Sequence, residues 1–393
     1  MTAHSADEQL LQRALELARE GIGLASPNPC VGAVIADPHG NVAGTGSYTY
    51  AGVKHAEILA LEAAGGKSRG GTLYINLEPH CHQGRTPPCT EALIRAGVRR
   101  VVASMADPNP KVSGRGFEQL RAAGVQVEVG GLEEQARRLN EAFARYARHG
   151  LPLVTLKAAM TLDGKIAPPP AEVLARANGT PAGGWVTSEV ARAHVQELRH
   201  QHDALMVGVG TVLTDNPLLT DRSGRARRRP LLRVILDSRL RLPLESRLVE
   251  NARAERKNDV LVFCSSRFRD AWDRQKWAAL ENAGIRVEDL PAEEPDGRPG
   301  MPAILRRLGE LEIISVMIEG GAIVNWIALA ENVVDKVFLY YAPKILAGTG
   351  SIPFAAGAGF QHMHQAAQVK RMHLHRFGED FAVEGYLRDV YEL

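Results

Sequence analysis

The chain has few cysteines. Only four occur in 393 residues, namely Cys30, Cys81, Cys89 and Cys264. A long chain with so few cysteines is not a disulfide scaffold, and a close pair such as Cys81 and Cys89 more often serves a metal or a catalytic step. Cys264 lies in the apolar run VLVFCSS, so we expect it to be a small core residue.

Long hydrophobic runs are also missing. The longest, such as VFLYYA near Val337, fall far short of the roughly 20 residues that cross a bilayer. The first twenty residues are charged and helical in pattern, without the basic start, apolar centre and small-residue cleavage site of a signal peptide. We therefore expect a cytoplasmic protein with no membrane partner.

Neither charge sign dominates, and aromatic residues are scarce. The formal net charge is +2 and aromatic residues make up 5%, which does not favour a nucleic-acid partner. The apolar share of 45% and the charged share of 23% are ordinary for a globular protein. Since a single core rarely grows past roughly 250–300 residues, 393 residues predict two domains.

Residues 1–150 alternate between helical and strand patterns, which predicts a layered α/β domain. HGLP at 149–152 is a Gly/Pro boundary, and we place the domain junction near Gly150. Helices are expected over 10–19, 55–64, 88–96 and 133–148, and strands over 30–36, 41–46, 71–77, 100–105 and 125–129.

Residues 151–393 alternate again and predict a second α/β domain. Its expected elements include the strands LVTLKAAM, DALMVGV, LLRVILDS, DVLVFCS, SVMIEGG and KVFLYYAP, helices over 189–199 and from 323, and a hairpin about GED. The Pro/Gly/Ala-rich stretch 167–184 is expected to be a surface insertion.

The first candidate site combines His55 and Glu57, at the start of a predicted helix, with the downstream loop LEPHCHQGRTPPC. H-x-E followed by a cysteine-bearing loop is the pattern of zinc-dependent nucleobase deaminases. Zinc needs three N or S ligands and one open position for water. The water attacks an amidine carbon, and a carboxylate that is not a ligand moves the proton to the leaving ammonia.

The motifs PNPCVGAVI, HAE, LEP, GRTPPC and ALIRAGVRRVVASMADPNPKVSGRG together resemble the deaminase half of the bifunctional riboflavin-biosynthesis family. The resemblance covers almost all of residues 8–150. It implies a cytidine-deaminase-like three-layer α/β/α domain that binds Zn²⁺. It further implies that His55 and Cys89 are zinc ligands, that Glu57 is the proton shuttle, and that Asn28 contacts the pyrimidine.

The chain departs from this family directly after E-P, where the family has a cysteine ligand and this sequence has His80. Three alternatives follow. His80 completes a His-His-Cys site, which is the set we predict; Cys81 swings in instead; or the site is damaged and the domain is a scaffold for a reductase. His82 is expected to contact substrate or solvent. A smaller departure is Tyr48, where the family often has histidine.

Polar segments end several strands of the second half, where ligands bind in open α/β sheets. They are TLDGK, GGWVTS, DALMVGVGTVLTDNPLLTDR, RVILDS, IEGG and YYAPKILAG. GVGT and EGGA offer backbone N–H groups for phosphates, but the full dinucleotide fingerprint is absent. As a set, over roughly 152–387, they resemble the reductase half of the same family, which is similar in fold to dihydrofolate reductase and uses NADPH.

This second resemblance implies site residues in three groups. Trp185, Thr211, Asp215, Gly320, Gly321 and Ala322 would lie at NADPH. Arg199, Leu219, Arg222 and Glu319 would lie at the substrate, where two arginines suit a phosphate. Lys157 and Asp215 would act near the reacting centre. Leu219 and Trp185 could instead be core residues, Asp215 a turn residue and Arg199 a surface charge.

The expected enzyme deaminates 2,5-diamino-6-(5-phosphoribosylamino)pyrimidin-4-one and then reduces the ribosyl group of 5-amino-6-(5-phosphoribosylamino)uracil with NADPH. The family suggests a dimer or tetramer. A rival is a deaminase module that edits bases in RNA, which low charge and few aromatics disfavour. The basic cluster 224–229 is either a solvated loop or a phosphate contact, and the histidines of 362–375 are expected on a strand surface.

Overall fold

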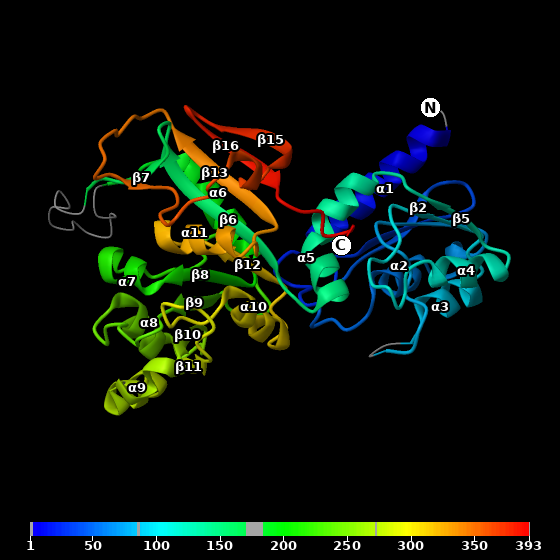
Figure 1. Ribbon diagram of the computed structural model, residues 1–393. Coiled ribbons are helices and arrows are strands. Elements are labelled where there is room, and N and C mark those ends of the chain that lie inside the picture. Colours follow the sequence, from blue (N-terminus) through cyan, green and yellow to red (C-terminus); the bar gives the residue numbers. More distant parts are fainter. Residues whose placement is uncertain (1–2, 85–86, 170–183, 272, 393) are drawn as a thin grey trace. The chain divides into compact units, whose positions relative to one another are not determined.

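A computed structural model describes residues 3–84, 87–169, 184–271 and 273–392 (Figure 1). It divides the chain into two compact units. Unit 1 consists of Met1–Gly150 and Ala226–Arg229, and unit 2 of Leu151–Arg225 and Pro230–Leu393. Most of the proposed insertion at 167–184 lies outside the described residues. None of the helices in the described ranges is long and apolar enough to cross a membrane.

Unit 1 is built on a five-stranded sheet in the order β2-β1-β3-β4-β5. β1 pairs antiparallel with β2 and β3, whereas β3, β4 and β5 run parallel. The strands are β1 (Gly32–Ala36), β2 (Val42–Ser47), β3 (Thr72–Ile75), β4 (Arg100–Ala103) and β5 (Gln126–Val129). The helices are α1 (Ala3–Arg19), α2 (Ala56–Ala64), α3 (Cys89–Ala96), α4 (Arg115–Ala122) and α5 (Glu133–His149).

The two faces of this sheet carry separate apolar clusters. Ala33 and Ile35 of β1 face the cluster under α2, α3 and α4, whereas Val34 and Ala36 face the cluster under α1. Successive side chains of a strand point to opposite faces, so one apolar strand serves both layers. Helices thus cover both faces, and the three-layer α/β/α prediction is confirmed.

A glycine on β2 brings α2 close to the sheet. A Cβ on Gly46 would lie 2.2 Å from the carbonyl oxygen of Ala56, the first residue of α2. Only a residue without a side chain permits this approach. The close packing fixes the start of α2, where His55 and Glu57 lie.

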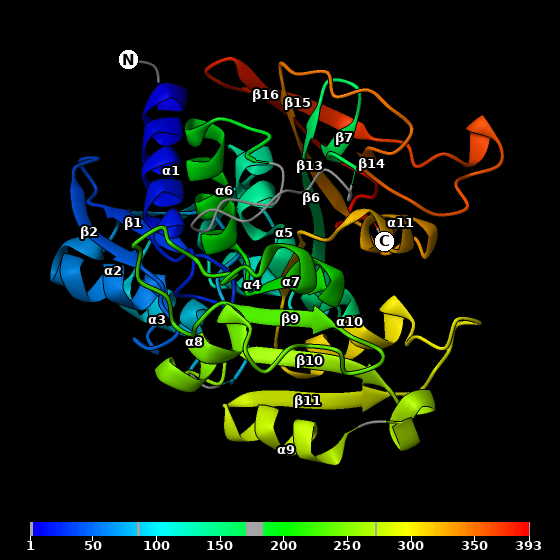
Figure 2. The same ribbon diagram turned by 90° about the vertical axis from the view of Figure 1, so that its left-hand side faces the viewer.

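Unit 2 contains a nine-stranded sheet in the order β11-β10-β9-β8-β12-β6-β13-β16-β15. The first seven strands run parallel, and β16 and β15 add an antiparallel edge. Figure 2 shows β9, β10 and β11 pointing the same way. Apolar clusters again lie on both faces. The α/β prediction for this half is confirmed.

The strands of unit 2 are β6 (Leu153–Thr161), β7 (Lys165–Ala167), β8 (Ala204–Gly208), β9 (Leu232–Leu236), β10 (Val260–Ser265), β11 (Ile285–Leu290), β12 (Ser315–Ile318), β13 (Lys336–Ala342), β14 (Ile352–Pro353), β15 (Lys370–Phe377) and β16 (Asp380–Tyr386). The helices are α6 (Glu189–Gln201), α7 (Val209–Asp215), α8 (Arg247–Glu255), α9 (Arg274–Asn282), α10 (Met301–Glu310) and α11 (Ala322–Ala330). β7 and β14 form a separate two-stranded sheet.

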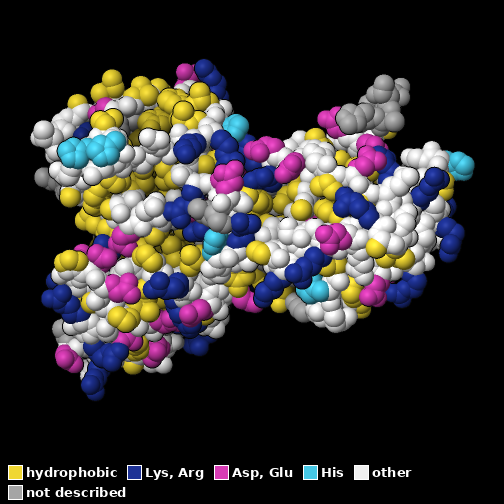
Figure 3. All heavy atoms as spheres, turned by 45° about the vertical axis from the view of Figure 1, so that its right-hand side comes forward, with side chains coloured by type: hydrophobic (Ala, Val, Ile, Leu, Met, Phe, Trp, Pro, Cys, Tyr) yellow, Lys and Arg dark blue, Asp and Glu magenta, His cyan; other side chains and the backbone are white. Residues whose placement is uncertain are grey.

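Surface charges of both signs are interspersed on the face drawn in Figure 3. This matches the small net charge of +2. The hairpin predicted about GED is β15 and β16, and Met372 and Leu374 of β15 are exposed. In the same strand, His375 pairs with the Glu384 carboxylate of β16 at 2.8 Å.

Candidate active sites

The first site forms where α2 and α3 begin. His55 is the N-cap of α2, Glu57 lies in its first turn, and Cys89 is the first residue of α3. His55 Nδ1 lies 3.2 Å from Cys89 Sγ. One candidate ligand atom from each of these three residues lies within 4.8 Å of the others. Two segments 32 residues apart in sequence are thereby joined into a donor set that suits zinc.

Glu57 and Cys89 are both buried beside each other. Burial raises the pKa of the Cys89 thiol far above its ordinary range, and the Glu57 carboxylate adds to the effect through charge and a hydrogen bond. A cation between these groups would supply the compensating positive charge. The chemistry of the donor set therefore fits a metal ion.

His80 lies beside this group, with its ring centroid 5.1 Å from that of His55. Its Nε2 lies 3.2 Å from Nε2 of His82. Its Nδ1 is buried and has no hydrogen-bond partner among the described residues. Burial, and then the neighbouring His82 and His55, lower the pKa of His80 to about 4. The imidazole is thus neutral, the form in which histidine binds metals.

Cys81 has different surroundings. It is partly exposed, and burial followed by the Glu78 carboxylate raises the pKa of its thiol. The other charged groups that act on it are Arg115 and Asp107. In the described part of the chain, neither Cys81 nor His80 belongs to the close group formed by His55, Glu57 and Cys89.

Asn28 is connected to His55 through Tyr48. Its Nδ2 donates to Tyr48 Oη at 2.6 Å, and the Tyr48 ring packs edge-on against His55 with centroids 5.6 Å apart. Tyr48, the smaller departure from the family pattern, is therefore a buried link between Asn28 and His55.

Sequence reasoning assigned no role to Glu78, although it quoted the LEP motif. The buried Glu78 carboxylate accepts three backbone N–H groups, from Asp107 at 3.0 Å, Gly114 at 2.8 Å and Gly116 at 2.7 Å. These bonds tie the loop after β3, which carries His80, to the loop before α4 and to the first turn of that helix. A carboxylate two residues before the predicted ligand His80 was the only signal in the sequence.

The second site centres on an ion pair between Arg199 of α6 and Glu319, directly after β12. Arg199 Nε and Nη2 each donate to a Glu319 carboxylate oxygen at 2.9 Å, and Nη1 donates to Thr220 O at 2.8 Å. Lys157 Nζ of the neighbouring β6 lies 3.8 Å from Glu319 Oε2. Glu319 thus occupies the guanidinium group for which the sequence analysis expected a substrate phosphate. Arg199 is therefore not a surface charge.

Burial alone would raise the pKa of Glu319, but the charges of Arg199 and Lys157 outweigh it and lower the pKa to about 2. Burial lowers the pKa of Lys157, which Glu319 partly opposes. A charged triad in low dielectric holds its geometry tightly, because each group needs its partners. Tyr340, which sequence reasoning did not single out, lies near this triad, with its ring centroid 5.7 Å from Lys157 Nζ.

Most of the residues predicted at NADPH lie on α7 and at the start of α11, and Asp215 is the last residue of α7. Thr211 and Asp215 belong to α7, and Gly321 is the N-cap of α11. A Cβ built on Gly321 would lie 3.9 Å from Thr211 Oγ1, so these two segments meet. Helix N-termini favour anionic groups. Ala322 opens α11, and a Cβ on Gly320 would collide with Val324 at 2.6 Å.

For three further predicted residues, the position in the structure does not by itself indicate a role at the site. Leu219 is buried in an apolar cluster of unit 2, and its φ is 57°. Trp185 is 46% exposed and lies under the guanidinium of Arg192, 4.5 Å from its ring centroid. Arg222 is exposed, and its backbone N–H donates to Gln196 Oε1 at 3.0 Å. Their assigned roles stay predictions, and Trp185 is not a core residue.

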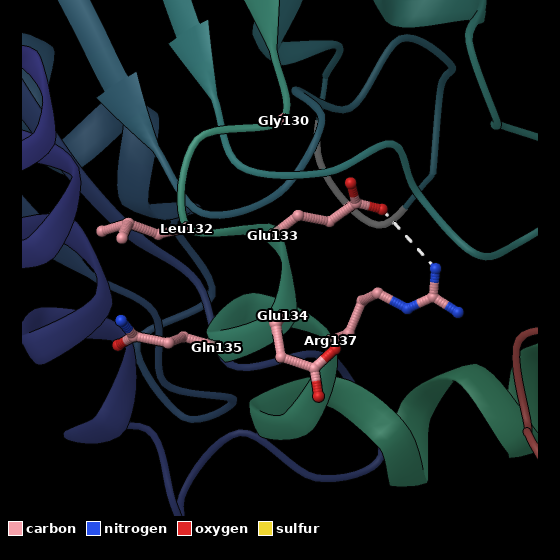
Figure 4. Close-up of a pocket in the computed structure, with 6 residues that line it drawn as sticks. All are labelled: Gly130, Leu132, Glu133, Glu134, Gln135 and Arg137. Carbon is pink, nitrogen blue, oxygen red and sulfur yellow. Dashed lines mark ion pairs between the residues drawn. The ribbon is translucent and has the colours of Figure 1, made fainter. Parts of the chain in front are cut away.

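One open hollow lies at the start of α5, away from these residues (Figure 4). Glu133 and Arg137 form an ion pair at its edge, 3.5 Å apart. The residues that line it are Gly130, Leu132, Glu133, Glu134, Gln135 and Arg137. None of them belongs to a predicted site.

Two family models match the chain. The model described as the RibD C-terminal domain matches residues 152–383, more than half of the chain. The model described as the cytidine and deoxycytidylate deaminase zinc-binding region matches residues 4–105. Each candidate site therefore falls within a matched region.

Relatives that match this chain over nearly its full length are also RibD proteins. The riboflavin biosynthesis protein RibD of Synechocystis is 41% identical over 381 residues, covering 97% of this chain and 96% of the relative. RibD of Actinobacillus pleuropneumoniae is 39% identical over 378 residues, covering 96% and 94%.

A solved structure extends the likeness to the fold. The diaminohydroxyphosphoribosylaminopyrimidine deaminase/5-amino-6-(5-phosphoribosylamino)uracil reductase of Thermotoga maritima superposes with a TM-score of 0.79 at 34% identity, covering 98% of this chain and 99% of that one. Because both halves match, a reductase with a scaffold domain is not favoured. The chain therefore belongs to the RibD family, and it is a bifunctional riboflavin-biosynthesis enzyme that joins a zinc-dependent deaminase to an NADPH-dependent reductase.

Proposed function

We propose that residues 1–150 deaminate 2,5-diamino-6-(5-phosphoribosylamino)pyrimidin-4-one, and that residues 151–393 reduce the ribosyl group of 5-amino-6-(5-phosphoribosylamino)uracil. The observation that carries the first assignment is the group of His55, Glu57 and Cys89, whose ligand atoms lie within 4.8 Å of one another. The deaminase and reductase activities in the name of the Thermotoga relative support both substrates.

In the deaminase, His55 and Cys89 would hold zinc, which when bound makes a water nucleophilic at neutral pH. The water oxygen adds to the carbon that bears the amino group. Glu57 takes a proton from the water and delivers it to the departing amine, so that ammonia leaves. Asn28, held by Tyr48, orients the pyrimidine.

We propose His80 as the third ligand, through Nδ1. His80 Nε2 faces His82 Nε2 at 3.2 Å, and such a contact is a hydrogen bond when one of the two nitrogens carries a proton. If His80 donates, its buried Nδ1, which has no hydrogen-bond partner within the described ranges, keeps a lone pair for the metal. The Glu78 carboxylate near Cys81 opposes a thiolate there, which favours His80 over Cys81.

In the reductase, NADPH supplies the hydride. The helix starts at Thr211 and Gly321 suit its phosphates, with Trp185, Gly320 and Ala322 beside them. Lys157 would lie at the reacting carbon and Asp215 would help deliver a proton. Arg199 keeps Glu319 charged and oriented at the substrate, and Leu219 and Arg222 complete that side.

The decisive experiment measures ammonia release from the deaminase substrate with zinc supplied and NADPH omitted. We expect steady turnover that Glu57→Gln lowers by about 10²–10⁴-fold while zinc stays bound. His80→Ala should lose zinc, and the matched variant Cys81→Ala should keep it. Zinc loss in Cys81→Ala alone would name Cys81 instead. No turnover, rescued by His80→Cys, would mean that the natural deaminase site is disabled.

We also propose that the enzyme works in the cytoplasm as a homodimer or homotetramer on small-molecule substrates, without a nucleic-acid partner. Light scattering of the purified chain reports the mass of the assembly. A measured mass equal to that of one chain would contradict the proposed oligomeric state.

A further inference from the structure

A short basic segment leaves unit 2 and becomes part of unit 1. Ala226–Arg229 belongs to unit 1, although the residues on both sides of it belong to unit 2. The segment is RRR preceded by alanine, and sequence reasoning left it as a solvated loop or a phosphate contact. The structure shows what two of its arginines bind.

Arg228 makes three contacts with unit 1. Its backbone N–H donates to Gly23 O at 2.8 Å, and its Nη1 donates to Ser26 O at 2.5 Å. Its guanidinium carbon lies 3.5 Å from the centroid of the Tyr50 ring. Arg229 adds a fourth contact, from Nη2 to Ser26 Oγ at 3.2 Å. The side chains of both arginines are partly buried.

These contacts fix the turn that leads to Asn28. Asn28 N–H donates to Ala25 O at 3.0 Å, and Tyr50 N–H donates to Leu24 O at 3.0 Å. The turn over residues 23–28 is therefore bound to Tyr50 on one side and to Arg228 on the other. From Asn28 the chain of contacts continues through Tyr48 Oη to the ring of His55.

We propose that Arg228 is a positioning residue for deamination. It clamps the turn over residues 23–28, from which Asn28 contacts the pyrimidine. A cation stacked on an aromatic ring and bonded to a partly buried carbonyl holds a fixed direction, which a solvated arginine does not. The deaminase site is thus completed by a segment whose sequence lies inside the reductase half. This inference rests on the proposed role of Asn28.

The test uses the full-length chain and measures KM and kcat of ammonia release, zinc content, and the rate of NADPH oxidation with the reductase substrate. Arg228→Ala should raise the deaminase KM about tenfold or more, with kcat changed much less, because a charged hydrogen bond and a stacking contact are lost. Zinc content and the reductase rate should stay unchanged. Arg228→Lys should restore part of the affinity.

The matched control is Arg225→Ala, which removes an exposed arginine of the same basic cluster that pairs with Glu197 of unit 2. It should leave the deaminase KM unchanged. Tyr50→Leu removes the stacking partner while Arg228 stays, so it reports on the clamp if Arg228→Ala fails to fold. Tyr50→Phe keeps the ring and should behave as the natural enzyme.

Asn28→Ala separates the clamp from the assigned role of Asn28. If Arg228 acts through Asn28, the double variant should have the KM of Asn28→Ala alone. If Asn28→Ala raises the deaminase KM and neither Arg228→Ala nor Tyr50→Leu does, the clamp is overturned and the role of Asn28 stands. An unchanged KM in Asn28→Ala would overturn the role of Asn28 itself. Equal loss of both activities in Arg228→Ala would also overturn the clamp.

Discussion

At the scale of single residues, the ion pair between Glu319 and Arg199 shows how charge is kept inside unit 2. The Glu319 side chain is 12% exposed and that of Arg199 is 11% exposed, and both guanidinium contacts measure 2.9 Å. Two charges buried this far depend on each other, since removal of one leaves the other buried without its main countercharge. The pair therefore stabilises unit 2, and its role at the reductase site stays a proposal.

The lowered pKa of Glu319, about 2 against an ordinary 4.5, makes stability depend on pH. The carboxylate stabilises the fold fully above pH 4.5, and this contribution is lost as the pH falls toward 2. At neutral pH it is worth about 3 kcal/mol. We expect Glu319→Gln to lower the free energy of unfolding of unit 2 at neutral pH and to flatten its decline between these two pH values.

Tryptophan fluorescence measures this effect in the full chain, because all four tryptophans lie between residues 185 and 326. Denaturant unfolding at a series of pH values follows unit 2 alone. Glu379→Gln, in the exposed turn between β15 and β16, is the matched control and should keep the natural slope. An unaltered slope in Glu319→Gln would contradict the lowered pKa.

At the scale of elements, Glu78 joins two segments that are about 30 residues or more apart in the sequence. It accepts N–H groups from Asp107 and Gly114, between β4 and α4, and from Gly116 in the first turn of α4, and it precedes His80 by two residues. Gly116 permits the contact, since a Cβ there would lie 2.3 Å from Pro79 O. The loop that carries His80 is thus anchored at its first residues.

We expect Glu78→Gln to lower the melting temperature of unit 1 and its zinc affinity. The amide can accept fewer of the three N–H groups and turns an NH₂ toward donors, which costs about 1–3 kcal/mol. Scanning calorimetry of the full chain measures the first effect, and competition with a chelator measures the second. Glu91→Gln, an exposed carboxylate of α3, should change neither. Unchanged zinc affinity in Glu78→Gln would mean that the anchor does not serve the site.

At the scale of the whole molecule, the two units have separate cores. The apolar clusters of unit 1 draw only on residues 10–132, and those of unit 2 only on residues 151–387. Each unit can therefore hold its own site without the metal or cofactor of the other.

Removal of zinc tests this independence. Treatment with a chelator should abolish ammonia release and leave NADPH oxidation with the reductase substrate at its natural rate. Restored zinc should bring ammonia release back. The two rates are measured on the same sample, so loss of protein affects both equally. Parallel loss of the two activities would show that zinc also supports the reductase unit.

Much of this molecule follows from its sequence. The apolar run that ends at Ala36 predicted the strand β1, which the structure buries on both faces, and Pro87 and Pro88 predicted the start of α3. The spacing of His55 and Glu57 placed both on one helix start. These features are local, because hydrophobic period, helix caps and motif spacing act between residues that are near in the chain.

Only the tertiary structure decided which distant groups meet. Glu319 pairs with Arg199 across 120 residues, and Arg228 reaches Ser26 across 202. Nothing near Arg228 in the sequence distinguishes it from Arg225, which stays on the surface of unit 2. His80 and Cys81 are adjacent, yet one lies beside His55 and the other in the field of Glu78. The physical reason is that charge pairing and burial depend on the packed surroundings, which a linear pattern does not contain.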